Sequence, residues 1–361
     1  DEFLASNLTV MAVTGTDGIS TTSWLLYSLL LAEFGAEKVY LSGNFDIPFS
    51  ETVRMILEKW QKRGYIVVEV SSFMAYSLHS FRSHYSIFTN FKADHLNWHQ
   101  DLQDYLDSKM HIIERAEKGS VVNAQILEFA KENHLKIRIP ENVRIFGEWK
   151  EKSDGWKIRK DYVAGDDIII SWRRKYKLSE TQFSGAHNAM NILASTLVTN
   201  MMKICSKHTK EYLKSITWLS HRLEKIGEKN GVTFVEDSKS TSSQSLEAAL
   251  WSFGVEKNLL LIVWWSDKWD SFDHLGSKFQ ERVKAMVCIG ATKEKFIEIA
   301  EKEDIPHIST DVLTDAVEFL WGNAKKWDVL MLSPWCASFW LFRDYFDRAN
   351  QFREIIKKIS E

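Results

Sequence analysis

Apolar runs alternate with amphipathic stretches along the first part of the chain. Residues 8–14 (LTVMAVT) form a continuous apolar run typical of a buried strand, and residues 21–34 show the spacing of a helix. Similar runs predict further strands at residues 38–41, 66–70, 85–89 and 120–123. Strands that alternate with helices predict a mostly parallel sheet that is covered on both faces.

The pattern changes between residues 143 and 178, where polar and apolar positions alternate around two turn signals. This segment predicts a small antiparallel addition, and a helix is predicted after it over residues 187–202. A second α/β series begins near Gly231. It predicts strands at residues 233–235, 259–264, 285–289 and 329–332, and helices at residues 243–252, 293–301, 311–320 and 339–358. We therefore expect two domains, residues 1–217 and 218–361.

Composition narrows the class of protein. The 46 basic and 49 acidic residues give a net charge of −3, which argues against a general nucleic-acid binder. The three cysteines, Cys205, Cys288 and Cys336, show neither a zinc spacing nor a disulfide framework, which favours a reducing compartment. No apolar run reaches the ~18 residues of a membrane span. We expect a cytoplasmic, monomeric protein that binds neither nucleic acid nor membranes.

A loop with two glycines links the first predicted strand to the first predicted helix. Its sequence is TGTDGISTT, and the residues that would surround a phosphate are Gly15, Thr16, Asp17, Gly18, Ser20 and Thr21. Glycines let the backbone wrap around a phosphate group, and a helix N-terminus presents free N–H groups to an anion. Ser20 stands where a hydroxyl would meet Mg²⁺. Taken alone, an ordinary glycine turn with a Ser/Thr cap explains the segment equally well.

This loop and the segments after it resemble the Mur ligase family. Six segments follow the TGTDGxST loop in the family's order: SGNF (42–45), EVSSF (69–73), NFKADHL (90–96), YLDSK (105–109), GAHNAMN (185–191) and HRLE (221–224). Three more resemble the branch of the family that adds D-glutamate: DSKST (237–241), SPWCASF (333–339) and FDRANQF (346–352). We expect the family's N-terminal, UDP-binding domain to be missing from these residues.

The resemblance implies a fold and a reaction. The fold would be a phosphate-loop NTPase-like central domain, with a mostly parallel sheet and a small antiparallel addition, followed by a Rossmann-like α/β C-terminal domain that binds the amino acid. The reaction would be ATP-dependent amide bond formation in peptidoglycan precursor synthesis. A carboxylate of UDP-N-acetylmuramoyl-L-alanine would form an acyl phosphate with ATP, and D-glutamate would then displace the phosphate.

The resemblance also implies residue roles. Ser20 and Glu69 would hold one Mg²⁺, and His95 with a carbamylated Lys109 would hold a second. The catalytic residues would be Glu69, His95, Lys109 and Lys268. The nucleotide would be bound by the loop residues together with Asn188, Asn191, Arg222 and Asp237. The substrates would be bound by Asn44, Ser71, Lys239, Thr241, Lys268, Ser338 and Phe346. Outside the family pattern, His95, Lys109 and Lys268 are explained as ordinary surface residues, and Arg222 as half of a surface salt bridge.

The chain departs from the family pattern in three ways. Ile19 replaces the lysine of the phosphate loop, a loss that corresponds to ~3 kcal/mol of transition-state stabilisation. Glu236 stands where the family has asparagine. Tryptophan also stands where the family usually has glycine, and the chain holds 15 Trp and only 16 Gly. We interpret these positions as glycines encoded by UGA, a codon that some bacterial genetic codes read as glycine and others as tryptophan. The positions are Trp218, Trp264, Trp265, Trp269, Trp327 and Trp335.

Three other classes of protein remain as alternatives to a ligase of this branch. Ile19 favours a nucleotide-binding protein that has lost ligase activity. A folate polyglutamate synthase is a related ligase, but the DSKST and SPWCASF segments argue against it. A purely structural α/β protein leaves the ordered polar motifs unexplained.

Overall fold

The computed structural model describes residues 8–45, 47–59, 63–96, 98–148, 161–171, 173–217, 221–240, 246, 249–250, 257–264, 276–290, 293–334 and 341–360. The chain divides into two compact units, Asp1–Thr217 and Trp218–Glu361. Each unit has its own β-sheet and its own hydrophobic core. Within the described ranges, no helix is both long and apolar enough to cross a bilayer.

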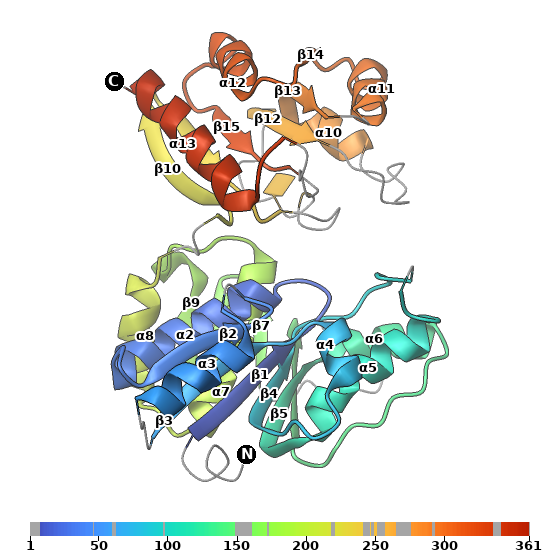
Figure 1. Ribbon diagram of the computed structural model, residues 1–361, viewed down its shortest axis with the longest axis vertical. Coiled ribbons are helices and arrows are strands. Elements are labelled where there is room, and N and C mark those ends of the chain that lie inside the picture. The colour runs from blue at the N-terminus through green and yellow to red at the C-terminus, as the bar shows by residue number, and fades with distance from the viewer. Residues whose placement is uncertain are drawn as a thin grey trace. The chain divides into compact units, whose positions relative to one another are not determined.

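The first unit is built on a nine-stranded sheet in the order β2-β3-β1-β4-β5-β6-β7-β8-β9 (Figure 1). Neighbouring strands are parallel from β2 to β7, and β7, β8 and β9 are antiparallel to one another. The predicted mostly parallel sheet with a small antiparallel addition is therefore confirmed. The strands are β1 Leu8–Thr14, β2 Val39–Gly43, β3 Gly64–Glu69, β4 Ser83–Phe88, β5 Ala116–Asn123, β6 Val143–Glu148, β7 Asp161–Ala164, β8 Asp167–Ile170 and β9 Arg174–Lys177.

Helices cover both faces of this sheet, which explains why the central strand is apolar throughout. Figure 1 shows α2 and α7 on one face and α4, α5 and α6 on the other. Ala12 and Val13 point to opposite faces of β1, yet both side chains are buried. The helices are α2 Ile19–Phe34, α3 Phe49–Glu58, α4 Ser72–Ser77, α5 Leu102–Glu114, α6 Ala124–Glu132, the 3₁₀ turn η1 Leu178–Glu180, α7 Ala186–Met201 and α8 Ser206–Ser215.

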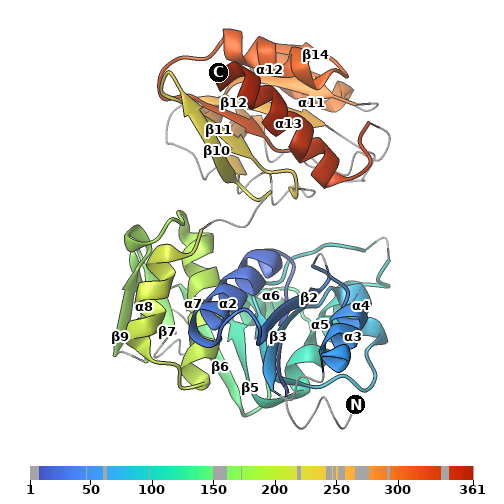
Figure 2. The same cartoon turned by 60° about the vertical axis from the view of Figure 1, so that its left-hand side comes forward.

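The second unit has a six-stranded sheet in the order β10-β11-β15-β12-β13-β14 (Figure 2). The first two strands form an antiparallel pair, and the remaining neighbours are parallel. This confirms the second α/β series. The strands are β10 Glu224–Lys229, β11 Val232–Glu236, β12 Leu259–Trp264, β13 Val283–Ile289, β14 His307–Ser309 and β15 Val329–Leu332, and the helices are α10 Gly276–Arg282, α11 Glu294–Lys302, α12 Leu313–Gly322 and α13 Tyr345–Ser360.

The C-terminal helix differs from its prediction over residues 339–358. Helix α13 begins only at Tyr345, because the carboxylate of Asp344 accepts a hydrogen bond from the N–H of Asp347 (2.8 Å) and caps the helix there. The prediction missed this cap because it followed the apolar spacing alone. The helix predicted at residues 243–252 lies largely outside the described residues.

Two of the tryptophans that stand in place of glycine lie in described segments, and their surroundings differ. Trp264 ends strand β12, is buried, and stacks on Phe342 with 5.8 Å between ring centroids. The indole is thus accommodated in the core, and glycine as the encoded residue at this position stays a prediction. Trp327 has φ = 79° and is 74% exposed, a conformation and a setting that suit glycine. The other four tryptophans, Trp218, Trp265, Trp269 and Trp335, lie outside the described residues.

We predict that Trp327→Gly stabilises the second unit by about 0.5–1 kcal/mol. The left-handed conformation costs a side-chain-bearing residue about 1–2 kcal/mol, and the added freedom of glycine in the unfolded chain offsets part of that gain. The Trp327 N–H donates to Gly231 O (2.8 Å), and glycine keeps this bond. Urea unfolding measures the change, with Trp321→Gly as control, because Trp321 packs on Phe234 and its loss should destabilise. A destabilised Trp327→Gly variant would contradict the prediction.

Candidate active site

The phosphate-type loop connects β1 to α2 at the carboxyl edge of the first sheet, and both of its glycines are required. A Cβ on Gly15 would lie 1.9 Å from Thr89 Oγ1. Gly18 caps α2 with φ = 70°, and a Cβ there would lie 2.7 Å from Asn191 Oδ1. The loop thus leaves room for backbone only. The first N–H groups of α2 have no acceptor within the helix and are available to an anion.

Hydrogen bonds from the end of β4 fix the shape of this loop. Asn90 accepts from the N–H of Asp17 through Oδ1 (2.8 Å) and donates to the Asp17 carbonyl through Nδ2 (3.0 Å). Thr89 Oγ1 donates to the same carbonyl (2.7 Å), and the N–H of Thr16 donates to Asn90 O (3.0 Å). These four hydrogen bonds to two loop residues make the loop rigid before any ligand binds.

Glu69 lies beside the loop with one carboxylate oxygen uncommitted. It ends β3, where Val13 of β1 is its partner in the register. Its side chain is buried, and Oε1 accepts from Asn44 Nδ2 (2.9 Å). Oε2 has no hydrogen-bond partner among the described residues. A buried, unsatisfied carboxylate oxygen is costly unless a cation binds it, so Glu69 fits the predicted Mg²⁺ ligand. Ser20, the other predicted ligand, is buried in the first turn of α2.

Lys109 reaches the loop from α5 on the other side. Its Nζ donates to Gly15 O, and it lies 4.8 Å from the ring centroid of Tyr105. Tyr105 in turn places its hydroxyl 3.2 Å from Thr16 Oγ1. Burial lowers the pKa of Lys109 to about 7, against the attraction of nearby carboxylates. A substantial fraction of this lysine is therefore a neutral amine near neutral pH.

His95, the last of the predicted metal ligands, is held less tightly than Glu69 and Lys109. It has φ = 54°, its side chain is 42% exposed, and Nε2 lies 3.5 Å from Asp94 Oδ2. Its ring lies 6.0 Å from that of Tyr105. Contacts through Tyr105 therefore connect His95 to Lys109 and the loop. The structure brings the predicted metal ligands to one edge of the sheet, while their roles stay predictions.

The other predicted residues of the first unit lie close to the same loop. Asn191 accepts from Thr22 Oγ1 (3.1 Å) beneath the loop, and Asn188 donates to Ser184 O (2.7 Å). Ser71 follows Glu69 and caps α4 by accepting from the Met74 N–H (3.3 Å). The two asparagines are buried, so their visible role is to support the loop and the start of α7.

In the second unit, Asp237 follows β11 and is buried with both oxygens occupied. Oδ1 accepts from the Leu223 N–H (3.0 Å), and Oδ2 accepts from Ser333 Oγ (2.8 Å). Burial raises the pKa of Asp237 to about 7, although the Ser333 bond and the charge of Arg222 oppose the rise. Asp237 thus holds the segment that bears Arg222 against the ends of β11 and β15, and its contact with nucleotide stays a prediction.

Two predicted substrate-binding residues, Lys239 and Phe346, meet around His221 and Tyr345. Lys239 Nζ lies 4.8 Å from the Tyr345 ring centroid, and the Lys239 N–H donates to His221 O (3.0 Å). The Phe346 ring stacks on Tyr345 at 4.2 Å and meets His221 edge-on at 5.2 Å. A cation beside exposed aromatic surface is thereby assembled. Three further predicted residues, Thr241, Lys268 and Ser338, lie outside the described part of the chain.

Glu236, which replaces the family's asparagine, belongs to a charged network. It accepts from Arg353 (2.8 Å), and its Oε2 lies 2.6 Å from His221 Nδ1. Arg353 also donates to Glu224 (2.6 Å). Burial alone would raise the pKa of Glu236, but hydrogen bonds from His221 and Ser238 leave it lowered. His221, Glu224 and Glu236 are close enough to hold a metal ion, but the guanidinium of Arg353 already neutralises both carboxylates.

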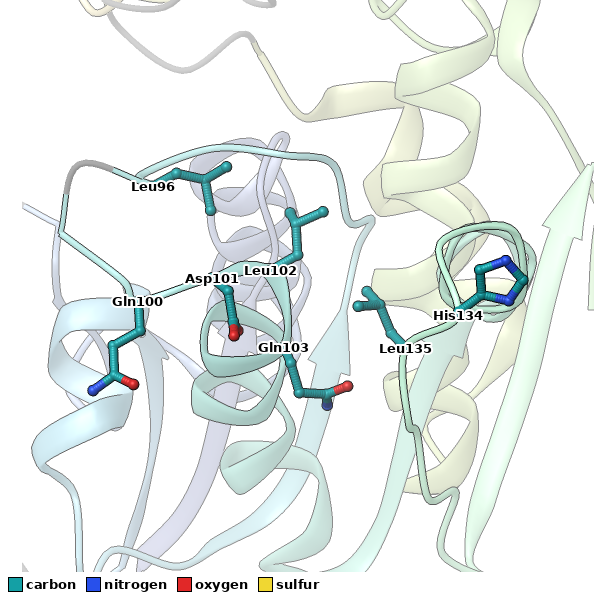
Figure 3. A pocket seen from close by; sticks show the side chains of 7 residues that line it. All are labelled: Leu96, Gln100, Asp101, Leu102, Gln103, His134 and Leu135. Atoms are coloured by element: carbon teal, nitrogen blue, oxygen red, sulfur yellow. The ribbon is translucent and has the colours of Figure 1, made fainter.

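A cleft of about 550 Å³ lies apart from this chemistry. Figure 3 shows its lining between the start of α5 and the turn after α6. The carboxylate of Asp101 caps α5 by accepting from the Asp104 N–H (2.8 Å). With its acid engaged in a helix cap, we assign the cleft no catalytic role. It is lined by Leu96, Gln100, Asp101, Leu102, Gln103, His134 and Leu135.

Sequence analysis missed several residues that hold the site together. Asn90 and Tyr105 both lie within segments that resemble the family, so their positions were a usable signal. Arg348 was also inside such a segment; it is buried, donates to Ser238 O and lies 4.6 Å from the ring centroid of Trp264. Arg353 lies just beyond the matching segment, and its charge pattern alone gave no signal.

A phosphate loop beside a buried acidic strand end is the arrangement of phosphate-loop nucleotide-binding proteins. Residues 13–199 match the family model of the Mur ligase middle domain. The chain therefore belongs to the Mur ligase family. It is 33% identical over 351 residues to the UDP-N-acetylmuramoylalanine–D-glutamate ligase of Aquifex aeolicus, covering 96% of this chain and 78% of that protein. It is 30% identical over 359 residues to the ligase of the same name from Geobacter metallireducens, with 97% and 75% covered.

Solved structures agree on the fold. The MurF ligase of Thermotoga maritima, solved in complex with ADP, superimposes with a TM-score of 0.68 at 18% identity, covering 99% of this chain and 81% of that one. A pseudomurein peptide ligase type C from Methanothermus fervidus gives a TM-score of 0.69 at 16% identity, with 98% and 79% covered. At these identities the similarity concerns the fold alone.

We predict that Asp237 makes the second unit less stable as pH rises. Its folded pKa of about 7 exceeds the ordinary value of about 4, so between these values the native state binds a proton that the unfolded chain has lost. Stability should fall with a slope of up to about 1.4 kcal/mol per pH unit from this group. Asp237→Asn keeps acceptor and donor atoms for Leu223 and Ser333, and it should flatten the slope between pH 4 and 7. An unchanged slope, measured by urea unfolding, would contradict the assignment.

Proposed function

We propose that the chain is an ATP-dependent ligase that adds D-glutamate to UDP-N-acetylmuramoyl-L-alanine. The observation that supports this most directly is the buried Oε2 of Glu69, uncommitted beside a rigid phosphate loop. The names of the relatives support the identity of the two substrates. Their coverage extends over both units, so the proposal concerns the whole chain.

The proposed reaction has two steps. A substrate carboxylate oxygen forms a bond to the γ-phosphorus of ATP while the bond to the β,γ-bridging oxygen breaks, and ADP leaves. The amine of D-glutamate then forms the C–N bond, the acyl C–O bond breaks, and phosphate leaves with the amine proton released to solvent. Both steps depend on position and on charge neutralisation. The rigid loop and the N-terminus of α2 would supply these for the phosphates.

Mg²⁺ fits the residues at the loop, and Glu69 and Ser20 would hold it. When bound, the ion would neutralise negative charge on the β- and γ-phosphate oxygens. Asn44 fixes the carboxylate of Glu69 by donating to Oε1 and leaves Oε2 for the ion. His95 and a carbamylated Lys109 would hold a second ion.

Lys109 is suited to carbamylation. Its amine is buried and its pKa is lowered to about 7, so the nitrogen lone pair is available to attack CO₂ and form a carbamate with release of a proton. The carbamate nitrogen keeps one N–H, which is enough to donate to Gly15 O as the amine does. The group gains two anionic oxygens, the ligand type that Mg²⁺ prefers.

The second unit would bind D-glutamate. A dicarboxylate needs cationic groups or donors, and Lys239 beside the aromatic surface of Phe346 offers one. Lys268, Thr241 and Ser338 would add the rest, and Arg222 and Asp237 would contribute to the nucleotide site. Ser71, at the cap of α4 next to Glu69, would contact the muramoyl substrate.

Ile19 favours a second candidate, a nucleotide-binding protein without ligase activity. One assay separates the two. ADP and phosphate release is measured with Mg-ATP and UDP-N-acetylmuramoyl-L-alanine, with and without D-glutamate, together with Mg-ATP binding by calorimetry. Release that depends on D-glutamate supports the ligase. Binding without such release supports the second candidate, and absence of Mg-ATP binding overturns both.

We predict that Glu69→Gln lowers the ATP-dependent activity about 10²-fold or more, because an amide cannot replace the carboxylate that faces the metal. The substitution keeps the shape of the side chain and an acceptor for Asn44. Glu132→Gln, on the exposed surface of α6, is the matched control and should behave as wild type. Magnesium titration should show the loss as weaker Mg²⁺ dependence. Equal activity of the two variants would remove Glu69 from the metal site.

We predict that Lys109 carries a carbamate in the active protein. After incubation with ¹³C-bicarbonate, NMR should show a carbamate carbonyl signal that is absent from Lys109→Arg, since a guanidinium does not react with CO₂. Activity should fall when dissolved CO₂ is removed and return when bicarbonate is added. A protein that is active without the signal would contradict the prediction.

A further inference from the structure

The substitution of Ile19 leaves the phosphate loop without its usual cation. The Ile19 side chain is half-buried and turns toward Gly15, where a Cβ would lie 3.2 Å from Ile19 Cγ2. The loop also contains the acidic Asp17. A tri- or diphosphate bound there would add several negative charges to a loop whose own charge is already negative. A working phosphate site therefore needs a cation from another segment.

Two lysines from outside the loop reach it. Lys109 approaches from beneath, is fully buried, and becomes an anion if it is carbamylated as proposed above. It cannot serve as metal-binding carbamate and as phosphate-binding ammonium at once. Lys92 approaches from the exposed side, with Nζ 3.4 Å from Asp17 Oδ2.

The backbone of Lys92 is held against the loop. Its N–H donates to Thr16 Oγ1 (3.1 Å), and two residues earlier Asn90 is hydrogen-bonded to both Thr16 and Asp17. The base of the side chain therefore has a defined position, while the ammonium end is free to turn. The Lys92 side chain is 49% exposed, whereas Asp17 Oδ2 is buried, so the ammonium leaves Asp17 only where bound phosphate oxygens attract it more strongly.

We propose that Lys92 supplies the phosphate-binding cation that the loop lacks at position 19. It turns from Asp17 to the β- and γ-phosphate oxygens of bound nucleotide and neutralises charge there during phosphoryl transfer. This inference rests on the proposed function, since it requires Mg-ATP to bind at this loop. The fold permits the exchange because a cation acts through its distance from the phosphates, and hydrogen bonds hold the backbone of Lys92 against the loop.

The test uses the 361-residue chain and calorimetric binding of Mg-ATP, Mg-ADP and AMP. Lys92→Ala should weaken Mg-ATP by about tenfold or more, the loss expected for one charge-assisted hydrogen bond, and leave AMP binding unchanged. Lys92→Arg should retain most of the affinity. Lys131→Ala, an exposed lysine of α6, is the matched control and should bind as wild type. Thermal unfolding of each variant checks that the fold is intact.

A double-mutant cycle with Ile19→Lys makes the test specific. If Lys92 substitutes for the missing lysine, Ile19→Lys should restore Mg-ATP binding to Lys92→Ala, and its gain there should exceed its gain in the wild-type background. Equal gains in both backgrounds, or equal loss of ATP and AMP affinity in folded Lys92→Ala, would overturn the inference. If wild type itself fails to bind Mg-ATP, the proposed function falls as well. If wild type binds and Lys92→Ala binds equally, only the role of Lys92 falls.

Discussion

The candidate active site depends on the hydrogen bonds that join the phosphate loop to the end of β4. Asn90 satisfies both backbone groups of Asp17, and Thr89 also donates a hydrogen bond to the Asp17 carbonyl. Gly15 has no side chain because Thr89 Oγ1 occupies the space where a Cβ would be. The loop is thus held by a neighbouring strand rather than by its own sequence. The backbone that follows this strand end, including that of Lys92, therefore has a fixed position relative to the loop.

In the second unit, a network of charged side chains fixes the position of the C-terminal helix. Arg353 of α13 joins Glu224 and Glu236, so the C-terminal helix and the β10–β11 pair are tied at one point. Only Glu236 is fully buried, so the network adds little net stability compared with apolar packing, but removing Arg353 leaves the charge of Glu236 buried without this partner. The network therefore specifies where α13 lies more than how stable it is. Because α13 begins at Tyr345 beside Phe346, it also places the aromatic surface around Lys239.

The sequence predicted most of this fold, because strands buried on both faces are apolar throughout. The predictions for β1, β12 and β15 agree with the structure residue by residue. The predicted start of α13 was wrong because the single capping side chain of Asp344 determines where the helix begins. The hydrophobic pattern predicted the two sheets. It did not predict the hydrogen-bond partners of Asp237, because Leu223 and Ser333 come from other parts of the chain. The burial of Trp264 was not predicted for a related reason: it depends on Phe342 and Arg348, which local pattern does not reveal.

Glu69 and Asp237 show how one chemical group at similar places in a fold takes opposite roles. Both are buried carboxylates at or just after the ends of parallel strands. In Asp237 both oxygens accept hydrogen bonds from the protein, which fix the side chain in place, and burial raises its pKa. In Glu69 one oxygen is fixed by Asn44 and the other has no partner among the described residues. An unsatisfied buried oxygen lowers the stability of the folded protein. Such an oxygen is retained where a bound ligand satisfies it. This difference in satisfied hydrogen bonds, rather than burial or residue type, separates the carboxylate that we propose binds a metal from the one whose visible role is support.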